Sequence, residues 1–323
     1  MATLAQQNQT PFCPICNIGK IITMLLTKFY PVLRSPSHMM RLSIVTLGTL
    51  MALWGGQGIQ AQTPTPTPAP PSTPEDYFKL GSVTRAIQLW SNDIRNGKEV
   101  AKSLYNRSQA YIVLKQYELA LEDLNQLIKQ QGINTPSQVY VIRGIALNEL
   151  NRFSEAIEDF KQAERLQPSY LVYANRALAY QRSNQYKLAL DDLIKAVSIS
   201  PTAIARLNLA NVRIQLGQFT EVVNEMTQLL AQEKTFFPAY LVRSIANYNL
   251  GKYEAAIQDC LFSLKIIPDQ PEAYYYAGLS FAKLNRKEDA SQNLIKAADL
   301  YLRQNQSQNY RQVLDKMSEL NLQ

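Results

Sequence analysis

The sequence predicts an all-α fold of repeated helical hairpins, on three observations. A small residue recurs at a nearly constant period, at Ala86, Ala120, Ala156, Ala189, Val222, Ala256 and Ala290, with successive gaps of 34, 36, 33, 33, 34 and 34 residues. Each period holds two apolar stretches with helical spacing, separated by a short polar turn. Proline follows the second stretch in several periods, where it ends a helix. A fixed period of this length is typical of a stacked array.

The unit that begins at Ser137 illustrates the pattern. Its first apolar stretch contains Tyr140, Ile142, Ile145, Ala146 and Leu150, its turn is Asn151-Arg152, and its second stretch contains Ala156, Ile157, Phe160, Ala163 and Leu166. Pro168 follows, and Pro201 and Pro268 stand at equivalent points of later units. We therefore expect two helices per unit, with the second ending just before the proline.

Two units match a known family motif closely. The unit from Tyr170 supplies Tyr173, Ala177, Tyr180, Ala189, Leu193, Ala196 and Pro201, and the unit from Pro271 supplies Tyr274, Gly278, Phe281, Ala290, Leu294 and Ala297. The chain thus resembles the tetratricopeptide repeat family, of an exported or membrane-tethered bacterial type, over about residues 75–304. This resemblance implies an α-solenoid, a right-handed superhelix of about six full hairpins with a truncated N-terminal hairpin and a C-terminal capping helix.

The predicted organisation follows from these units. We expect an extension at 1–38, a signal peptide or membrane anchor at 39–61, a Pro/Thr-rich linker at 62–74, the repeat array at 75–304 and a capping helix at 305–323. Within the array, we expect a partial repeat at 75–98 and full repeats at 101–136, 137–169, 170–202, 203–236, 237–270 and 271–304. The repeat from Ala203 departs from the pattern at Arg206, Val222 and Lys234, so it is expected to be the least regular joint.

The N-terminal segment has the pattern of an export signal. Met39-Met40-Arg41 precedes an apolar run from Leu42 to Trp54, and small residues lead to Ala61. The run is short for a bilayer span, which needs about 20 apolar residues, so a cleaved signal is preferred over an uncleaved anchor or an accidental apolar stretch. The expected location is the periplasm or a lumen, or a membrane with the array facing outward.

Two features near this segment receive structural interpretations. Translation that starts at Met39 or Met40 would exclude Cys13 and Cys16 from the protein. These two cysteines also lack the second pair of ligands that a structural zinc site needs. The alternating Thr-Pro run that ends at Pro74 predicts an extended polyproline spacer, with O-glycosylation or partner recognition as alternatives.

The charge of the array is nearly balanced. The chain has 33 Lys and Arg against 26 Asp and Glu, and four of the basic residues but none of the acidic ones precede residue 62. The remainder therefore holds 29 basic and 26 acidic residues. A helical-repeat nucleic-acid binder is the alternative function, and this balance disfavours it.

No catalytic, cofactor-binding or metal site is predicted. The only histidine, His38, precedes the array, so the array cannot form a Cys–His or Ser–His dyad, and Cys260 is expected to be a buried apolar thiol. Paired acidic residues recur in successive repeats, where a single active site would not require them. We expect ion pairs of Asp123, Asp159, Asp192 and Asp259 with Arg107, Arg143, Arg176 and Arg243.

The family resemblance also implies a concave groove lined by the first helices, in which a peptide or helix of a partner protein binds. Its offsets correspond here to Tyr105, Ile112, Val141, Ile145, Leu171, Asn175, Leu178, Ile204, Leu207, Asn208, Asn211, Leu241, Ile245, Tyr248, Tyr275 and Leu279. The alternative is that several of these side chains pack between first helices. The cations that clamp acidic chaperone tails in this family are missing, since the matching offsets hold Ala174, Leu178, Asn208, Pro238 and Val242. The predicted role is a non-enzymatic scaffold, which aids assembly of an envelope or membrane complex.

Overall fold

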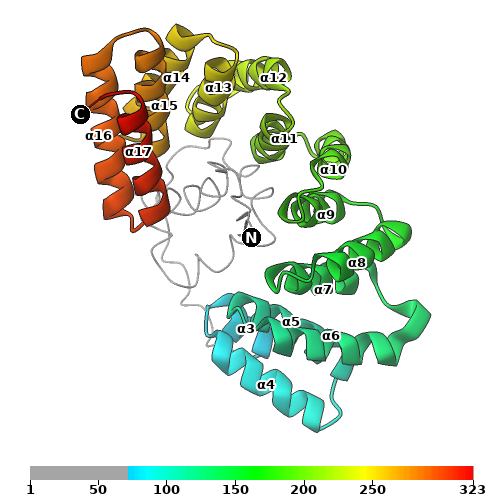
Figure 1. Ribbon diagram of the computed structural model, residues 1–323. Coiled ribbons are helices and arrows are strands. Elements are labelled where there is room, and N and C mark those ends of the chain that lie inside the picture. The colour runs from blue at the N-terminus through cyan, green and yellow to red at the C-terminus, as the bar shows by residue number, and fades with distance from the viewer. Residues whose placement is uncertain (1–71, 323) are drawn as a thin grey trace, which may run out of the picture. The chain divides into compact units, whose positions relative to one another are not determined.

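The computed structural model describes residues 72–322 (Figure 1), so the predictions for residues 1–71 lie outside the described part. The described residues form helices and turns, without strands. They divide into two compact units, here called the N-terminal unit (residues 72–212) and the C-terminal unit (residues 213–322). The predicted all-α fold of helical hairpins is confirmed.

The N-terminal unit begins with a short hairpin and continues with full ones. Its helices are α3 (Pro74–Lys79), α4 (Val83–Arg95), α5 (Val100–Val113), α6 (Tyr117–Gln131), α7 (Ser137–Glu149), α8 (Phe153–Leu166), α9 (Tyr170–Arg182), α10 (Tyr186–Ile199) and most of α11 (Ala203–Gln215), with a 3₁₀ turn η4 (Gly132–Asn134). Pairs such as α5 with α6 and α7 with α8 pack together, and first helices α5, α7 and α9 contact one another in turn.

The C-terminal unit continues the same pattern. It contains α12 (Phe219–Gln232), α13 (Phe237–Asn249), α14 (Tyr253–Ile266), α15 (Pro271–Lys283), α16 (Lys287–Arg303) and α17 (Ser307–Glu319). The last helix packs on α16, and its Val313 is buried in the same apolar cluster as Leu294 and Tyr301. Helix α17 therefore closes the core of this unit, as the predicted capping helix should.

Buried small residues explain why the helices of a hairpin approach so closely. All seven residues of the recurring small position, from Ala86 to Ala290, are 0% exposed. On the facing first helices, a Cβ atom built on Gly144 would lie 2.7 Å from the ring of Phe160, and one on Gly278 would lie 2.8 Å from Cγ of Leu294. These distances are too short for real contacts, so the glycines permit the approach of the second helix.

The turns inside the hairpins share one backbone conformation. The second residue after each first helix has a positive φ, as in Asn151 (61°), Asn184 (60°) and Gly251 (74°). The amide of the next residue then donates to a carbonyl five residues earlier, as Arg152 does to Leu147 at 2.9 Å. Asparagine and glycine suit this left-handed conformation, which lets the chain reverse direction within the three residues between the two helices.

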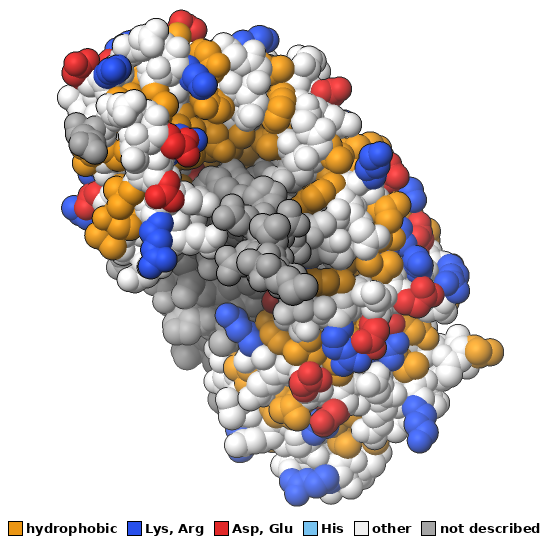
Figure 2. Space-filling view, in the orientation of Figure 1, with side chains coloured by type: hydrophobic (Ala, Val, Ile, Leu, Met, Phe, Trp, Pro, Cys, Tyr) orange, Lys and Arg blue, Asp and Glu red, His pale blue; other side chains and the backbone are white. Residues whose placement is uncertain are grey.

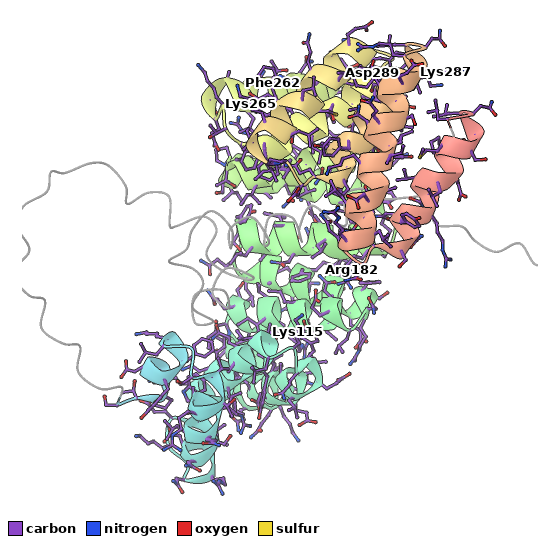
Figure 3. All side chains as sticks on the ribbon, turned by 90° about the vertical axis from the view of Figure 1, so that its left-hand side faces the viewer. Lys115, Arg182, Phe262, Lys265, Lys287 and Asp289 are labelled. Carbon is purple, nitrogen blue, oxygen red and sulfur yellow. The ribbon has the colours of Figure 1, made fainter. Side chains whose placement is uncertain are left out.

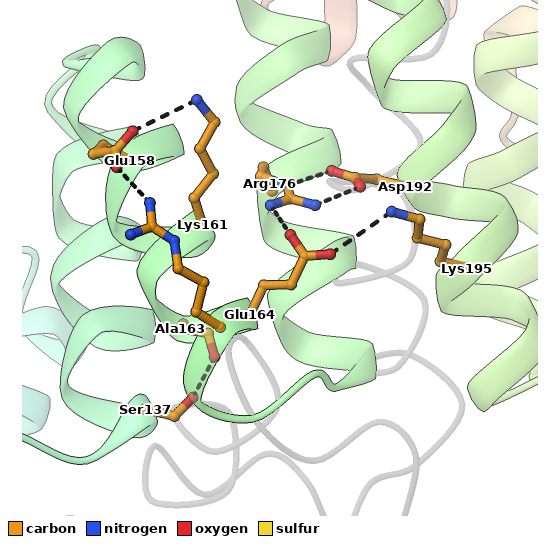
Figure 4. A network of polar contacts seen from close by, with 9 residues as sticks. Ser137, Glu158, Lys161, Ala163, Glu164, Arg176, Asp192 and Lys195 are labelled. Atoms are coloured by element: carbon orange, nitrogen blue, oxygen red, sulfur yellow. Dashed lines mark hydrogen bonds and ion pairs between the residues drawn. The ribbon is translucent and has the colours of Figure 1, made fainter.

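Four repeats contain the predicted arginine–aspartate pair, which links the two helices of a hairpin. In Figure 4, Arg176 on α9 donates from Nε and Nη2 to the carboxylate of Asp192 on α10, at 2.7 and 2.8 Å, and both residues are buried. The other three pairs, Arg107–Asp123, Arg143–Asp159 and Arg243–Asp259, have the same bidentate geometry. The structural interpretation of these acidic residues is confirmed.

The remaining guanidinium nitrogen of each pair reaches back to the preceding repeat. Nη1 of Arg176 donates to Glu164 of α8 at 2.5 Å, and the equivalent nitrogens of Arg107, Arg143 and Arg243 donate to Ser91, Asn125 and Thr227. Burial opposes the charge of Arg176, but hydrogen bonds with Asp192 and Glu164 raise its pKa. Each arginine therefore stabilises both the fold of its own hairpin and the stacking on the previous one.

The repeat from Pro271 lacks this pair, with Ala277 and Asn293 at the two offsets, and so does the repeat from Ala203. Leu209 and Glu225 stand at the offsets of the arginine and the aspartate, and Glu225 instead accepts from Arg213 at 2.6 Å. The division between the two compact units falls in this repeat, between Val212 and Arg213 in α11. The sequence departures thus coincide with the place where the structure divides.

Candidate functional site

The most open part of the predicted groove face lies on α9 in the N-terminal unit. Leu171 and Leu178 are 36% and 40% exposed, and the half-buried Asn175 lies between them. Their spacing of four and then three residues places all three on one face of the helix. The side-chain amide of Asn175 donates to the carbonyl of Leu171 at 2.7 Å, which fixes its orientation along the helix.

Neighbouring first helices continue this face with partly covered side chains. Tyr105 on α5, Ile145 on α7, and Ile204 and Asn208 on α11 are half-buried. Burial raises the pKa of Tyr105, so its phenol stays neutral near pH 7. These side chains lie on first helices before and after α9, and none of them is charged.

Other predicted groove residues of the N-terminal unit are buried. Ile112 and Val141 are 4% and 7% exposed and belong to one apolar cluster of α5 to α9. Leu207 and Asn211 on α11 are 1% and 5% exposed. Burial of this kind fits the alternative that such side chains pack within the array, so these four residues are not offered to a ligand in this conformation.

The same is true of most predicted groove residues in the C-terminal unit. Leu241, Ile245 and Leu279 are buried in its apolar core cluster. Tyr248 and Tyr275 are half-buried, and each packs edge-on against Tyr276, with ring centroids 5.8 and 5.4 Å apart. Burial raises the pKa of Tyr248, and that of Tyr275 to about 12, so both act as neutral aromatic surfaces.

Cys260 is buried, as predicted, beneath α15. Burial raises the pKa of its thiol to about 12, which leaves almost no thiolate at neutral pH. Because the thiolate is the nucleophilic form, this residue is suited to packing rather than to chemistry. Within residues 72–322, no three His, Cys, Asp or Glu side chains are grouped so that they could hold a metal ion.

Sequence reasoning missed a polar junction beside the α9 face. Nη1 of Arg182, at the end of α9, donates to the carbonyl of Asn148 at 2.7 Å, and Nη2 donates to Oδ1 of Asn151 at 3.0 Å. Its guanidinium also lies 5.2 Å from the centre of the Phe153 ring. The side-chain amide of Asn148 donates in turn to the carbonyl of Asn175 at 3.1 Å. This junction holds α7 and α9 together, and an arginine 34 residues after an asparagine was the only signal of it.

Together, the buried small residues, the left-handed turns and the paired helices define a protein of stacked helical hairpins. The family model described as tetratricopeptide repeat matches residues 105–170 and 143–204. Residues 105–204 therefore consist of tetratricopeptide repeats. A search of the curated proteins finds no match.

Solved structures share the fold at low sequence identity. The C-terminal part of a TPR repeat-containing protein from Cytophaga hutchinsonii is 17% identical with a TM-score of 0.59, covering 70% of this chain and 93% of that chain. A tetratricopeptide repeat protein from Parabacteroides merdae is 18% identical with a TM-score of 0.58, covering 75% and 96%. A chain of the APC/C hetero-tetramer Cut9–Hcn1 is 15% identical with a TM-score of 0.54, covering 75% and 48%.

The tetratricopeptide fold suggests a protein–protein interaction scaffold. Proteins built from this repeat bind other proteins or peptides and are generally not enzymes. The coarse function follows from the repeat itself, whereas the partner and the residues that bind it require a separate argument.

Proposed function

We propose that this protein is a non-enzymatic scaffold that binds a peptide or helix of a partner protein along its first helices, with α9 as the centre of the site. The observation that carries the proposal is the stripe of Leu171, Asn175 and Leu178 on α9. Two exposed leucines at this spacing offer an apolar contact, and burying one removes about 1.5–3 kcal/mol of unfavourable hydration. An amphipathic helix or an apolar peptide is therefore the fitting ligand.

The charges near this stripe support an uncharged or weakly charged ligand segment. The flanking residues Tyr105, Ile145, Ile204 and Asn208 are all uncharged. On the face drawn in Figure 2, basic and acidic side chains are mixed, with hydrophobic side chains in small groups between them. Mixed signs of charge favour apolar contacts over the phosphate contacts on which nucleic-acid binding depends.

The proposed location is outside the cytoplasm, either free in the periplasm or a lumen, or tethered to a membrane, where the protein aids the assembly of a membrane or envelope complex. This part of the proposal rests on the segment from Met39 to Ala61, which has the composition of an export signal. Within residues 72–322, no helix has the length and apolarity needed to cross a membrane. Sequencing the N-terminus of the native protein tests the proposal, and an intact Met1 would contradict cleavage near Ala61.

Selection of peptides from a random displayed library against the full chain tests the binding site. We expect selected peptides to carry spaced apolar residues, and Leu171→Glu with Leu178→Glu to weaken their binding at least about tenfold, the loss of about 1.4 kcal/mol. The matched control is Leu188→Glu with Ile194→Glu on the second helix α10, where the leucine and isoleucine are 45% and 46% exposed.

Loss of binding in the α9 variant alone supports the proposed site. Equal affinity in both variants and the unaltered chain would place the ligand elsewhere and contradict it. Circular dichroism checks that both variants remain helical, which is expected because all four substituted side chains are exposed.

A further inference from the structure

One edge of the N-terminal unit exposes an aliphatic side chain at three successive turns. Ile133 in η4 is 97% exposed, and Leu166 and Ile199, the last residues of α8 and α10, are 45% and 51% exposed. Successive helices alternate in direction, so the second helices α6, α8 and α10 all end at the same edge. We call the segments 129–138, 165–171 and 195–206 the turn edge.

The charged residues of the turn edge all have one sign. It contains Lys129, Arg165, Lys195 and Arg206, and the acid next to it is Glu164, the residue before Arg165. Arg165 pairs with Glu158 at 3.1 Å and Lys195 with Glu164 at 3.7 Å, from positions earlier on the second helices. Exposed pairs of this kind are weak and leave the cations open to other anions.

Helix electrostatics account for only part of this arrangement. A basic residue in the last turn of a helix offsets the partial negative charge at the helix end, which explains Lys129 and Arg165. It does not explain Lys195, which lies before the last turn of α10, or Arg206, which lies in the first turn of α11, where the helix end carries a partial positive charge. Single exposed aliphatic side chains are normal on a protein surface, so it is their position beside these cations that points to a ligand.

The equivalent turns elsewhere do not share the combination. In the C-terminal unit, segment 232–238 contains Glu233, and segment 265–272 contains Asp269 and Glu272. The opposite edge of the N-terminal unit, where Lys115 and Arg182 are labelled in Figure 3, also contains Glu118, Glu149 and Glu155. At the same edge of the N-terminal unit, the α4–α5 turn contains Glu99 beside Arg95 and Lys98, so the combination belongs to the three turns that follow α6, α8 and α10.

We propose that the turn edge docks on the surface of an anionic lipid bilayer. Its cations face the lipid phosphates, each contributing to binding within a Debye length of the surface. Ile133, Leu166 and Ile199 enter the boundary between headgroups and acyl chains. A bilayer fits better than a protein partner because the three aliphatic side chains project singly from turns, and a soft surface accepts such tips without a matching pocket.

A tryptophan placed at the edge reports directly on this contact. The full chain carrying Ile133→Trp is mixed with vesicles of equimolar phosphatidylcholine and phosphatidylglycerol with brominated acyl chains. We expect the added emission to shift to shorter wavelength and to be quenched. Leu188→Trp is the control, because Leu188 is 45% exposed in the first turn of α10, at the opposite edge. Any binding by the apolar run 42–54 is common to both variants.

Removal of basic residues from the turn edge is the second test of lipid docking. The variant Lys129→Gln, Arg165→Gln and Lys195→Gln is expected to lose up to about fivefold in vesicle affinity for each charge. The control Lys252→Gln, Lys265→Gln and Lys287→Gln removes three exposed cations from the C-terminal unit and is expected to lose less.

Several results would overturn the proposal. These are equal quenching of the two tryptophans, absence of quenching at residue 133, or equal weakening by the two charge variants. Preferential binding of polyglutamate by the turn edge, with no binding to vesicles, would assign it to an acidic polypeptide instead. Quenching at residue 133 alone, reduced by the edge substitutions, supports lipid docking.

Discussion

The regular repeats and the repeat from Ala203 are built on the same period but are held together differently. In the repeat of α9 and α10, Arg176 forms a bidentate pair with Asp192 and also reaches Glu164 of the preceding repeat. In the repeat of α11 and α12, Leu209 takes the place of the arginine and has no group that could form these bonds. The division between the two compact units falls in this second repeat.

This comparison separates two roles within one motif. The apolar period, with a buried small residue in each second helix, suffices to form the helices, because α11 and α12 are as long as their counterparts. The arginine contributes directed contacts that extend across to the previous hairpin. The repeat of α15 and α16 also lacks the pair, with Ala277 and Asn293 at these offsets, yet α15 packs on α14 within one compact unit. We infer that apolar packing forms and stacks the hairpins, whereas the arginine adds directed contacts to the previous hairpin.

Arg176→Leu is expected to have the largest effect on stability, because it gives a regular repeat the leucine that stands at this offset in the repeat from Ala203. Asp192 is 3% exposed and would lose its partner, so the free energy of unfolding should fall by about 3–5 kcal/mol. Urea denaturation followed by circular dichroism measures it. Arg176→Leu with Asp192→Leu should recover most of the loss, because no buried charge remains. An equal loss in the single and double variants would contradict this explanation.

Gly144→Ala tests the close approach of helices in a regular repeat. The added Cβ would lie 2.7 Å from Cε1 and Cζ of Phe160, whose ring is fully buried. Overpacking of this kind destabilises by about 1–3 kcal/mol. Gln138→Ala, at an exposed position of the same helix, is the control and should change stability by less than about 0.5 kcal/mol. A midpoint of denaturation unchanged by Gly144→Ala would show that the Phe160 ring can move to accommodate the added methyl group.

Val222→Ala makes the reverse change, because it gives the repeat from Ala203 the alanine that the other repeats have at this position. Val222 is 0% exposed, so its neighbours already pack around the larger side chain. Removing two methyl groups should destabilise by about 1.5 kcal/mol, at about 0.8 kcal/mol for each buried group. Thermal denaturation measures the change. A gain in stability would mean that valine strains this repeat.

Lys115→Gly has the smallest expected effect and should stabilise. Lys115 has a φ of 59°, at the turn position where other repeats have asparagine or glycine. Glycine relieves the steric cost of this conformation, and we expect a gain of about 0.5–1 kcal/mol after its larger backbone entropy is counted. Lys98→Gly, at an exposed position of the α4–α5 turn, is the control. A loss of stability in Lys115→Gly would imply a contact of the lysine side chain that outweighs the strain.

Much of the fold could be predicted because its determinants recur. The period identifies the small residues, which are all buried, and the constant offset of 16 residues identifies the four arginine–aspartate pairs. The partners of the third guanidinium nitrogen differ from repeat to repeat, as Ser91 and Glu164 do. No period predicts these partners, because they depend on how one hairpin stacks on the next.

The candidate site was harder to predict, because residues at the same position in different repeats differ in how deeply they are buried. Leu178 and Ile245 hold the same position in their first helices, yet Leu178 is 40% exposed and Ile245 is 1% exposed. Exposure depends on what packs over a residue, which lies beyond its own repeat. Ile133 was missed for a related reason, since it lies in the turn of the only 36-residue repeat, outside the periodic pattern.

Hydrogen exchange tests the central claim, binding along the first helices, most directly. Amide exchange of the full chain is compared with and without a selected peptide at saturating concentration. We expect added protection in α9 and in its neighbour α7, with α8 and α10 unchanged. Protection confined to the second helices α8 and α10 would contradict binding along the first helices, because the ligand would then bind the face that carries Leu188 and Ile194.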